Sequence, residues 1–590
     1  MRILKTLFGY PGVGIVRDIK SRWPYYASDW TDAINYRVVP ASVYMYFCNL
    51  LPAIAFAQDM FDKTNNSYGV NEVLLASAMG GIVFGLLAGQ PLCIVGVTGP
   101  VAIFNYTIYE IITPRGTPYF AFMCWVCLWA MVMHFIIAIF NWVSSLKYIT
   151  RYSCDVFGFF ICYVYIQKGI QICTRQFNIL DGGSVDQAAT ATTMGYMSVM
   201  VALLVLIVGY LFNYLGSHTK LFTVAIRKFL LDYGTPLTVV FFTGFIHFGQ
   251  MSQVSLARLP TTKSFTPTDL VQRPHGWFIH FWEIDVADVF LAIPFALLMT
   301  FLFYFDHNVS SLICQGSEYP LKKPASFHWD FLLLGVTTGA AGILGIPAPN
   351  GLIPQAPLHT SSLCVQVLTY DDDKGQYSQV TDHVVEQRVS NFVQGLLILG
   401  TMSGPLLIVL GLVPQCVLAG LFWVMGFTGL QGNGVTNKLI YIFTDKRYIP
   451  QDHPLNSVKK TWYFYAFVVL ELIAFGFEFG ITQTVAAVGF PGVLLFFAAV
   501  AVTFPYWIPH EILTVLDEPT AEEFIMANLN ITPPEDDSDT ASSKRASTTL
   551  TTDQIYLLDL FWSSNFRLLE ELENGEKGEL RARSAIRLPT

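Results

Sequence analysis

Long apolar segments separated by short polar loops dominate the chain between residues 36 and 507. Their lengths lie close to the roughly 20 residues that a helix needs to cross a bilayer. Fourteen such segments are predicted, at residues 36–57, 70–90, 98–112, 119–141, 153–173, 193–216, 234–250, 284–312, 330–346, 356–368, 389–411, 413–431, 462–479 and 484–507. This pattern predicts an all-α polytopic membrane protein with a polar head at residues 1–35 and a tail at residues 508–590.

Two of these segments, 98–112 and 356–368, are too short to cross the membrane alone, and each follows a Pro- and Gly-rich stretch. In the first stretch, QPLCIVGVTGPVAIFN at 90–105, β-branched residues after Pro91 favour extended backbone, and Gly99-Pro100 suits a helix start. Non-helical backbone at membrane depth is tolerated only where protein buries it or where it lines a cavity. We therefore expect short strands before two half-helices, and a substrate site beside them.

The two halves of the chain carry matching residues at a nearly constant separation. The separations run from 254 to 258 residues, in the pairs Pro40 and Pro294, Glu72 and Asp330, Gly81 and Gly339, Pro91 and Pro349, and Pro100 and Pro357. Each half holds seven predicted spans, and an odd number makes the second half enter from the opposite side of the membrane. The pattern predicts a 7+7 inverted repeat, residues 36–250 and 284–507 joined by an outer loop at 251–283, as in alternating-access transporters.

Composition agrees with a bilayer as the solvent. Hydrophobic residues make up 53% of the chain and charged residues 13%, with a mean hydropathy of +0.48, whereas soluble domains carry about 25% charged residues. The net charge of -9 comes from the tail, so it says little about a substrate. Most of the ten cysteines lie in apolar runs, and the CxxC pair Cys124 and Cys127 has no second pair. We expect no metal, no cofactor, no enzymatic activity and no nucleic-acid partner.

The distribution of basic residues predicts the orientation. Most of the 34 Lys and Arg fall in the head, the tail and the loops of one side, and this is the cytoplasmic side under the positive-inside rule. No cleavable signal peptide is predicted before the first segment. Both termini are therefore expected in the cytoplasm. The triplet Asn65-Asn66-Ser67 falls on the outer side, but so near a helix end that we expect no glycosylation there.

The two half-helix starts give the candidate binding site. Their unpaired N–H groups and positive dipole ends should converge near the midplane and favour an anion. Polar side chains beside the breaks could supply directional hydrogen bonds to a small oxyanion or hydroxylated species. The predicted binding residues are Thr98, Gly99, Pro100, Asn350, Gln355, Ala356, Pro357 and His359. Two alternatives stay open: both helices could be proline-kinked packing helices, and the amides could serve to join helices.

Asp306 is the strongest single candidate, because it lies inside the apolar segment 284–312. An intramembrane carboxylate is costly and is functional by default, so we expect a proton- or charge-coupling role. A structural ion pair is the alternative, although the predicted core segments offer no obvious basic partner. His307 points about 100° away on the same helix and is assigned to packing. Glu471 and Glu478 share one face of a later segment and are assigned to the scaffold.

Several collinear motifs resemble the bicarbonate-transporter superfamily, solute carrier family four, and within it the plant and fungal borate transporters. The motifs are DWTDAINYRV, FCNLLPAIAF, QPLCIVGVTGPVAIFN, ITRYSCDVFGFF, FYFDHNVSSLI, FHWDFLLLG and GIPAPNGLIPQAPLHTSSL. The resemblance implies a core of spans one to four and eight to eleven, and a gate of spans five to seven and twelve to fourteen. It also implies elevator-like transport by the moving core, and a homodimer joined through the gates.

Two departures from the family pattern narrow the substrate. Animal anion exchangers carry a large cytosolic N-terminal domain, and they have an arginine where this chain has Gln355. A neutral amide suits borate, whose hydroxyls both donate and accept hydrogen bonds. The exchanger glutamate of span eight is matched by Asp306. The resemblance implies a plasma-membrane exporter of tetrahydroxyborate, with bicarbonate or another small anion as the second reading and an anion channel or a membrane sensor as further alternatives.

The tail and one cytosolic loop add predictions about surfaces. The acidic stretch 533–539 and the Ser/Thr-rich residues that follow predict disorder, with a candidate phosphorylation site at 544–547. An apolar stripe at helical spacing between Ile555 and Leu569 is expected to dock on the membrane surface, the transporter or a partner. Lys438 and the other basic residues of loop 432–461 are expected to set the topology and to contact lipid headgroups.

Overall fold

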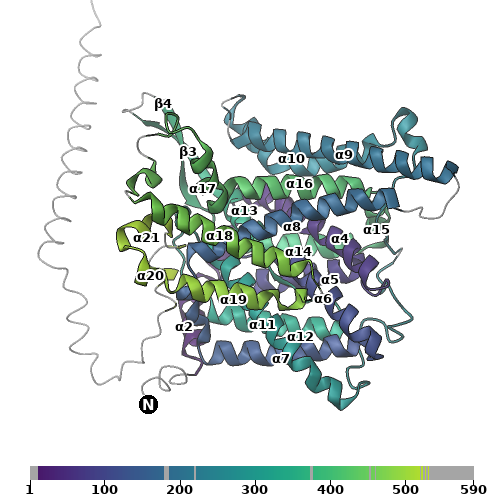
Figure 1. Ribbon diagram of the computed structural model, residues 1–590. Coiled ribbons are helices and arrows are strands. Elements are labelled where there is room, and N and C mark those ends of the chain that lie inside the picture. The colour runs from purple at the N-terminus through teal and green to yellow at the C-terminus, as the bar shows by residue number, and fades with distance from the viewer. Residues whose placement is uncertain are drawn as a thin grey trace, which may run out of the picture. The chain divides into compact units, whose positions relative to one another are not determined.

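The computed structural model describes residues 11–178, 185–217, 219, 221–262, 264–371, 376–450, 453–458, 460–484, 486–517, 520–521, 525–526 and 529. These residues all belong to one compact unit (Figure 1). The predicted phosphorylation site at 544–547 and the apolar stripe between Ile555 and Leu569 lie outside the described residues.

Helices make up most of the described chain. Up to residue 245 they are α2 (Val13–Arg22), α3 (Ser28–Thr31), α4 (Val38–Lys63), α5 (Val70–Leu87), α6 (Gly99–Ile112), α7 (Tyr119–Ile139), α8 (Arg151–Asn178), α9 (Val185–Ser217) and α10 (Val224–Phe245). After the loop that follows α10 they are α11 (Val286–Ile313), α12 (His328–Leu344), α13 (Gln355–Ser362), α14 (Val389–Thr401), α15 (Gly404–Leu410), α16 (Gln415–Gly432), α17 (Gly434–Phe443), α18 (Thr461–Thr482), α19 (Phe490–Ala501), α20 (Phe504–Trp507) and α21 (His510–Leu516). The protein is therefore mostly helical and polytopic, as predicted.

Eight helical stretches of the described residues are long and apolar enough to cross a membrane by themselves. They comprise α4, α5, α7, α8, α11 and α18, most of α9, and the stretch Ala487–Trp507 that contains α19 and α20. The bent pair α14 and α15 gives a ninth if it is counted as one span. The half-helices α6 and α13, with 14 and 8 residues, are too short.

The predicted apolar segment 356–368 is wrong in its second half. Helix α13 ends at Ser362, and strand β3 (Cys364–Asp371) follows and pairs antiparallel with β4 (Gln376–Val384). Val365 and Val367 stand in β3, and β-branched residues fit a pleated strand better than a helix interior. High hydropathy therefore indicated burial there but not the helical form.

The predicted continuous segment 389–411 is broken. Helices α14 and α15 meet at an angle of 89° around Met402 and Ser403. Pro405 lies in the first turn of α15, where its missing N–H costs nothing, whereas inside a continuous helix it would remove a hydrogen bond. The Gly404-Pro405 pair thus starts a new helix.

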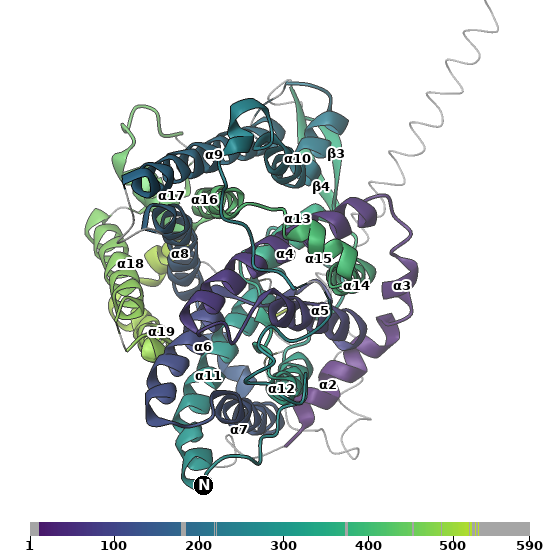
Figure 2. The same cartoon turned by 90° about the vertical axis from the view of Figure 1, so that its right-hand side faces the viewer.

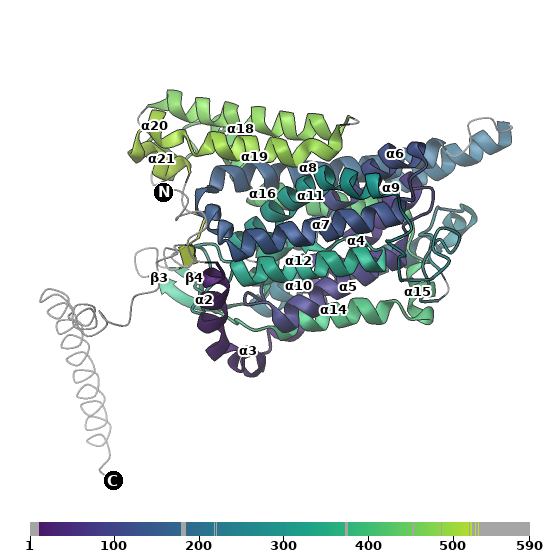
Figure 3. The ribbon, with the colours of Figure 1, turned by 90° about the horizontal axis from the view of Figure 1, so that it is seen from below.

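The membrane helices pack in two groups, which the end-on view of Figure 2 separates. In the first group, which consists of α4–α7 and α11–α14, α14 packs on α4 and α5, and α7 packs on α11 and α12. In the second group, which consists of α8–α10, α16, α18 and α19, α16 packs on α8 and α9, and α18 packs on α8. Many of the long helices run roughly parallel to one another (Figure 3).

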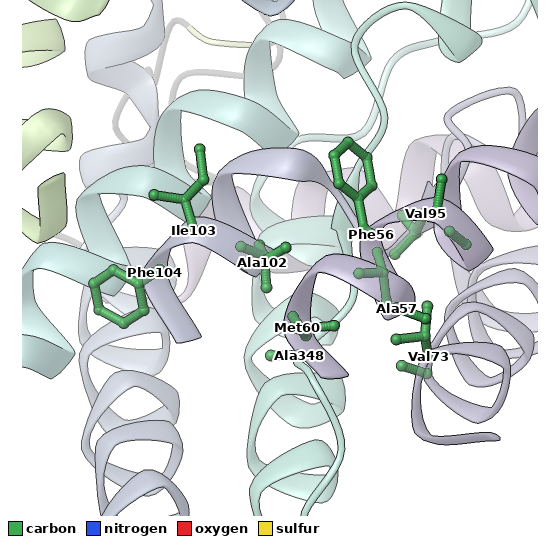
Figure 4. Close-up of a cluster of buried hydrophobic side chains, with 14 of the residues drawn as sticks. Phe56, Ala57, Met60, Val73, Val95, Ala102, Ile103, Phe104 and Ala348 are labelled. Atoms are coloured by element: carbon green, nitrogen blue, oxygen red, sulfur yellow. The ribbon is translucent and has the colours of Figure 1, made fainter. Parts of the chain in front are cut away.

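Two very short strands lie inside the first group. Strand β1 (Val95–Gly96) precedes α6, strand β2 (Asn350–Gly351) precedes α13, and the two pair antiparallel. Apolar side chains of α4 and α6, among them Phe56, Met60 and Ala102, form a buried cluster with Val95 of β1 (Figure 4). Neighbouring protein thus buries the extended backbone, as non-helical backbone in a membrane requires.

Candidate functional site

The pairing of β1 with β2 brings the starts of the two half-helices together. Val95 pairs with Gly351 and Gly96 with Asn350, and the N–H of Leu352 donates to the carbonyl of Ile94 at 2.9 Å. Helix α6 begins three residues after β1, and α13 begins four residues after β2. Residues that lie more than 250 positions apart in the sequence are therefore neighbours in the fold.

The start of α6 is built from local chemistry. Thr98 is the N-cap residue, and its hydroxyl oxygen accepts a hydrogen bond from the N–H of Val101 at 3.4 Å. Pro100 lies in the first turn, where no N–H is needed. A Cβ at position 99 would lie 2.8 Å from the ring of Phe56, so glycine fits there without moving that ring. The helix start is thus held tightly against α4.

The start of α13 lies equally close to α11. A Cβ on Gly351 would come within 2.8 Å of the Cα of His307 and 3.0 Å of the Cβ of Ser310. Only glycine allows β2 to lie directly on α11 at this point. This close approach sets Asn350 beside Asp306.

Asp306 is a buried carboxylate that accepts a hydrogen bond from a neutral amide. It projects from α11, its exposed fraction is 2%, and its Oδ2 accepts from Nδ2 of Asn350 at 3.2 Å. Asn350 also accepts, through Oδ1, from the N–H of Gly351 at 2.8 Å. Asp306 forms no ion pair with any residue that the structure describes. His307 packs edge-to-face on Phe84, with ring centroids 5.3 Å apart.

A narrow cavity adjoins both helix starts. It is lined by Thr98, Gly99 and Pro100 at the start of α6, by Asp306, by residues 351–354 before α13, and by Ile161 and Tyr165 of α8. The centre of a water molecule has about 10 Å³ of room in it, which is about what one ordered water needs. The first helix group supplies the two helix starts and Asp306, and the second group supplies Ile161 and Tyr165.

The other predicted binding residues lie at different places. Gln355 is fully buried, its Nε2 donates to the carbonyl of Cys48 at 3.4 Å, and its side chain interacts with the hydroxyl of Tyr165. Ala356 is buried outside the cavity lining. Pro357 lines a larger, neighbouring cavity, and its carbonyl accepts from the hydroxyl of Tyr319.

His359 holds the turn that precedes β1. Its Nδ1 lies 2.8 Å from the carbonyl oxygen of Leu92, and its Nε2 lies 2.6 Å from the hydroxyl of Ser390. Asn391 of α14 supports the same turn, since its Nδ2 donates to the carbonyls of Pro91 and Cys93 at 3.0 Å each. The structure thus places His359 among groups that position the site and not in the cavity lining.

Sequence reasoning missed the two cavity residues from the second group. Ile161 and Tyr165 lie one turn apart on α8, in a segment that reads as an ordinary apolar span. The hydroxyl of Tyr165 in an otherwise apolar run was the available signal, because a buried tyrosine hydroxyl usually finds a polar partner. Ile161 and Tyr165 face α6 and α13 because of the way the two helix groups pack, and hydropathy contains no information about that packing.

A larger cavity adjoins the narrow one and shares Ile353 and Pro354 with it. Its volume open to the centres of water molecules is about 400 Å³. Besides apolar side chains, polar and charged residues line it, including Arg151, Asp155, Glu318, Asn433 and Thr520. The larger cavity therefore reaches the residues that directly precede α13.

Lys438 was predicted to contact lipid headgroups, and this prediction is wrong. It is buried, with Nζ 2.5 Å from Oε1 of Glu471 and 3.8 Å from Oδ2 of Asp155. Lys438 of α17 thus lies between carboxylates of α8 and α18 and offsets their buried charge. The assignment of Glu471 to the scaffold agrees with this pairing.

The sequence comparisons identify the family. Residues 10–190 and 169–521 match the family model described as the HCO3- transporter integral membrane domain. The chain belongs to this family. A putative transporter of Schizosaccharomyces pombe is 53% identical over 86% of this chain and 96% of that protein. Boron transporter 1 of Saccharomyces cerevisiae is 52% identical over 90% of this chain and 89% of that protein.

More distant members of the family include animal proteins. The human Band 3 anion transport protein is 28% identical over 83% of this chain and 54% of its own length. The matched ranges of the family model contain both half-helices, Asp306 and the residues of α8 that close the cavity. The family resemblance predicted from the motifs is confirmed, and the described site lies within the transporter domain of the family.

Proposed function

We propose that the protein exports borate from the cell as the tetrahydroxyborate anion, by alternating access across the plasma membrane. The observation that carries the proposal is that two half-helix starts, with Thr98 at one of them, adjoin one cavity lined also by Asp306, a carboxylate without an ion pair among the described residues. The 52% identity to a protein named Boron transporter 1 supports borate as the anion.

The chemistry of the cavity suits a hydroxylated anion. The N-termini of α6 and α13 offer N–H groups and positive dipole ends to the negative charge. Tetrahydroxyborate also carries four hydroxyls, which can donate hydrogen bonds to acceptors. Asp306 and the hydroxyl of Thr98 are acceptors at the cavity wall. A carboxylate beside an anion is thus tolerable for borate, because one borate hydroxyl can donate to it.

Binding requires the two helix groups to separate. Room for about one water does not accommodate the five heavy atoms of tetrahydroxyborate, and Ile161 and Tyr165 close the cavity from the second group. In the proposed cycle, α4–α7 and α11–α14 form a core that carries the anion, and the second group forms the gate. Movement of the core past α8 would open the site to one side at a time.

The proposed topology has fourteen membrane segments in a 7+7 inverted repeat. The antiparallel pairing of β1 with β2 supports it, because two copies related by an axis in the membrane plane would place their corresponding strands in this way. The proposed domains are a cytoplasmic head at 1–35, repeats at 36–250 and 284–507, an extracellular loop at 251–283 and a cytoplasmic tail at 508–590. The larger cavity has Arg151, Glu318, Asn433 and Thr520 in its wall, so it faces the cytoplasm in this orientation.

The assembly is proposed to be a homodimer joined through the gates, surrounded by membrane lipids. Helices α9 and α10 of the second group expose large apolar side chains, among them Leu203, Ile207, Leu211, Leu237 and Val240. Such surfaces suit either lipid or a second copy of the chain.

Boron efflux from proteoliposomes tests the function. Vesicles that contain the purified protein are loaded with borate, and boron release is measured with and without pH and voltage gradients. Release that depends on the protein supports the proposal, and its response to the gradients distinguishes proton coupling, electrogenic transport and uniport. Release no faster than from protein-free vesicles contradicts borate transport.

Bicarbonate or chloride exchange is the second candidate, because the family model describes HCO3- transport and human Band 3 is a relative. The same vesicles loaded with radiolabelled bicarbonate or chloride distinguish the two functions. Exchange of these anions without boron release favours the second candidate.

A further inference from the structure

The outer loop between α10 and α11 carries two imidazoles and a carboxylate at one point. The side-chain ligand atoms of His275, His280 and Glu283 all lie within 4.8 Å of one another. Nδ1 of His280 is 2.9 Å from Oε1 of Glu283, and the rings of His275 and His280 stack with centroids 3.6 Å apart. In the part of the chain that the structure describes, no other group of three His, Cys, Asp or Glu residues meets this spacing.

We propose that His275, His280 and Glu283 bind one divalent transition-metal ion of the Zn²⁺ class. Two imidazole nitrogens and one carboxylate oxygen form a ligand set that Zn²⁺ prefers, and a water can fill the fourth position. Ca²⁺ and Mg²⁺ prefer sites made of oxygen ligands alone. The site is independent of the proposed anion site, because it shares no residue with that cavity.

The backbone around the three ligands is held in place. The N–H of Ile279 donates to the carbonyl of Ile343 at 2.9 Å, and Nε1 of Trp125 donates to the carbonyl of Phe281 at 2.7 Å. Gly276 adopts a φ of 72°, a left-handed conformation that few side chains allow, in the turn that follows His275. The loop thus brings the ligands together before any ion binds, which reduces the entropy that binding would otherwise cost.

Small side-chain movements complete the geometry. Ligands of a tetrahedral Zn²⁺ lie about 3.4 Å apart for metal–ligand distances near 2.1 Å, whereas Nδ1 of His280 and Oε1 of Glu283 are 2.9 Å apart and all three ligand atoms lie within 4.8 Å of one another. The stacked rings must turn so that both nitrogen lone pairs point at one atom. His275 and Glu283 are exposed and His280 is partly exposed, so their side chains can turn without repacking the core.

The charges around His275, His280 and Glu283 are compatible with a bound cation. Arg273 lines the same surface cavity as the three ligands, but its guanidinium lies 3.9 Å from Glu72 and 3.9 Å from the ring centroid of Phe120. Nη2 of Arg273 also donates to the carbonyl of Gly345 at 2.5 Å, five residues before Asn350. A bound ion would therefore fix a loop that contacts the chain leading into β2.

Metal binding to the full-length protein in detergent tests the site. The protein is purified without a histidine tag, and Zn²⁺ binding is measured by calorimetry and by competition with a chromogenic chelator. One ion per chain is expected. His275→Ala and His280→Ala should each weaken binding at least about tenfold, since each removes a ligand. Zn²⁺ should also raise the thermal midpoint of the wild type, because an ion that binds only the folded protein stabilises it.

His383→Ala is the matched control. His383 also has a neighbouring carboxylate, with Nδ1 2.7 Å from Oδ2 of Asp382, but it belongs to no three-ligand group. This variant should bind Zn²⁺ as the wild type does. Equal affinity in the wild type and in both His275→Ala and His280→Ala, or equal loss in His383→Ala, would overturn the proposal. Co²⁺ spectra give a second readout, because nitrogen and oxygen ligands lack the thiolate absorption that binding to cysteine would produce.

Discussion

Two buried carboxylates of this protein have opposite surroundings. Asp29 of α3 is fully buried and accepts from Nη2 of Arg22 at 2.9 Å, Nη2 of Arg388 at 2.7 Å and Nζ of Lys323 at 2.8 Å. Asp306 of α11 is also buried, but among the described residues it has no charged partner and accepts a hydrogen bond from the neutral amide of Asn350. Buried charges in proteins are normally paired, so Asp29 follows the rule and Asp306 departs from it.

The surroundings of Asp29 explain its pairing. Nη1 of Arg388 donates to the carbonyl of Leu86 at 2.9 Å, which satisfies an end of α5. Glu386 accepts from the N–H groups of Lys322 and Lys323, and burial raises the pKa of Glu386 while these hydrogen bonds lower it. Burial likewise lowers the pKa of Arg22, against the attraction of Asp29. This ionic cluster fastens the helices of the head to the first helix group.

Asp29 and Asp306 are expected to have different roles. A buried ion pair contributes little net stability, but removing one partner leaves an uncompensated charge and is strongly destabilising. An unpaired carboxylate beside a cavity is available to a ligand or a proton, and this is the usual reason for its presence in a membrane. Asp29 should therefore matter for folding, and Asp306 for transport.

The largest effect is expected for Asp306. Asp306→Ala should abolish boron efflux, because it removes both the charge and the acceptor for a borate hydroxyl. Asp306→Asn should retain some borate binding and lose the pH dependence of transport. Both variants should fold, since a charge at the centre of a membrane helix costs about 2.5–3.5 kcal/mol on insertion scales. Boron efflux measured against pH, in vesicles with matched protein amounts, checks this. Wild-type rates and pH response in the Asn variant would make Asp306 a structural polar group.

Asp29→Ala should affect stability and leave the chemistry of transport unchanged. It leaves Arg22, Arg388 and Lys323 buried without their shared counter-charge, and such changes cost about 3–5 kcal/mol. The thermal midpoint in detergent and the yield of folded protein measure the loss. Efflux per folded molecule should equal that of the wild type. A folded Asp29→Ala protein of normal stability that transports no boron would reverse the comparison.

Gln355→Arg should change selectivity more than rate. A cation next to the start of α13 attracts simple anions more strongly, so bicarbonate or chloride flux should rise and boron efflux should fall. Gln355→Met is the control, because it keeps the length of the side chain and adds no charge. Parallel flux assays with the three anions measure the ratio. Normal boron efflux by the Arg variant would show that Gln355 does not contact the anion.

The smallest effect is expected for Asp32, which lies near Asp29 and forms an ion pair with the same residue, Lys323. Its Oδ2 lies 2.8 Å from Nζ of Lys323, but its side chain is 47% exposed. Ion pairs in contact with solvent contribute about 0–1 kcal/mol, so Asp32→Ala should leave the thermal midpoint nearly unchanged. A loss as large as that of Asp29→Ala would mean that burial does not explain the difference between the two carboxylates.

Local sequence properties predicted much of the fold. Hydropathy located the membrane helices, and Pro and Gly marked the breaks before α6 and α13, because both effects act within a few neighbouring residues. Hydropathy alone failed at two places. Residues 363–368 were predicted as part of a helix, but β-branched residues favour the strand found there. Residues 402–403 were predicted inside one helix, but the Gly-Pro pair that follows them starts a second helix. The family motifs and the position of Asp306 inside an apolar run were also readable from the sequence.

Tertiary structure alone decided which groups meet. The pairing of β1 with β2, the contact of Asn350 with Asp306 and the closure of the cavity by Tyr165 join residues that are distant in sequence. Sequence patterns could not tell a paired buried charge such as Asp29 or Lys438 from an unpaired one such as Asp306. The physical reason is that hydropathy and helix propensity depend on near neighbours along the chain, whereas the compensation of a buried charge depends on which distant side chains the packing brings within a few ångströms.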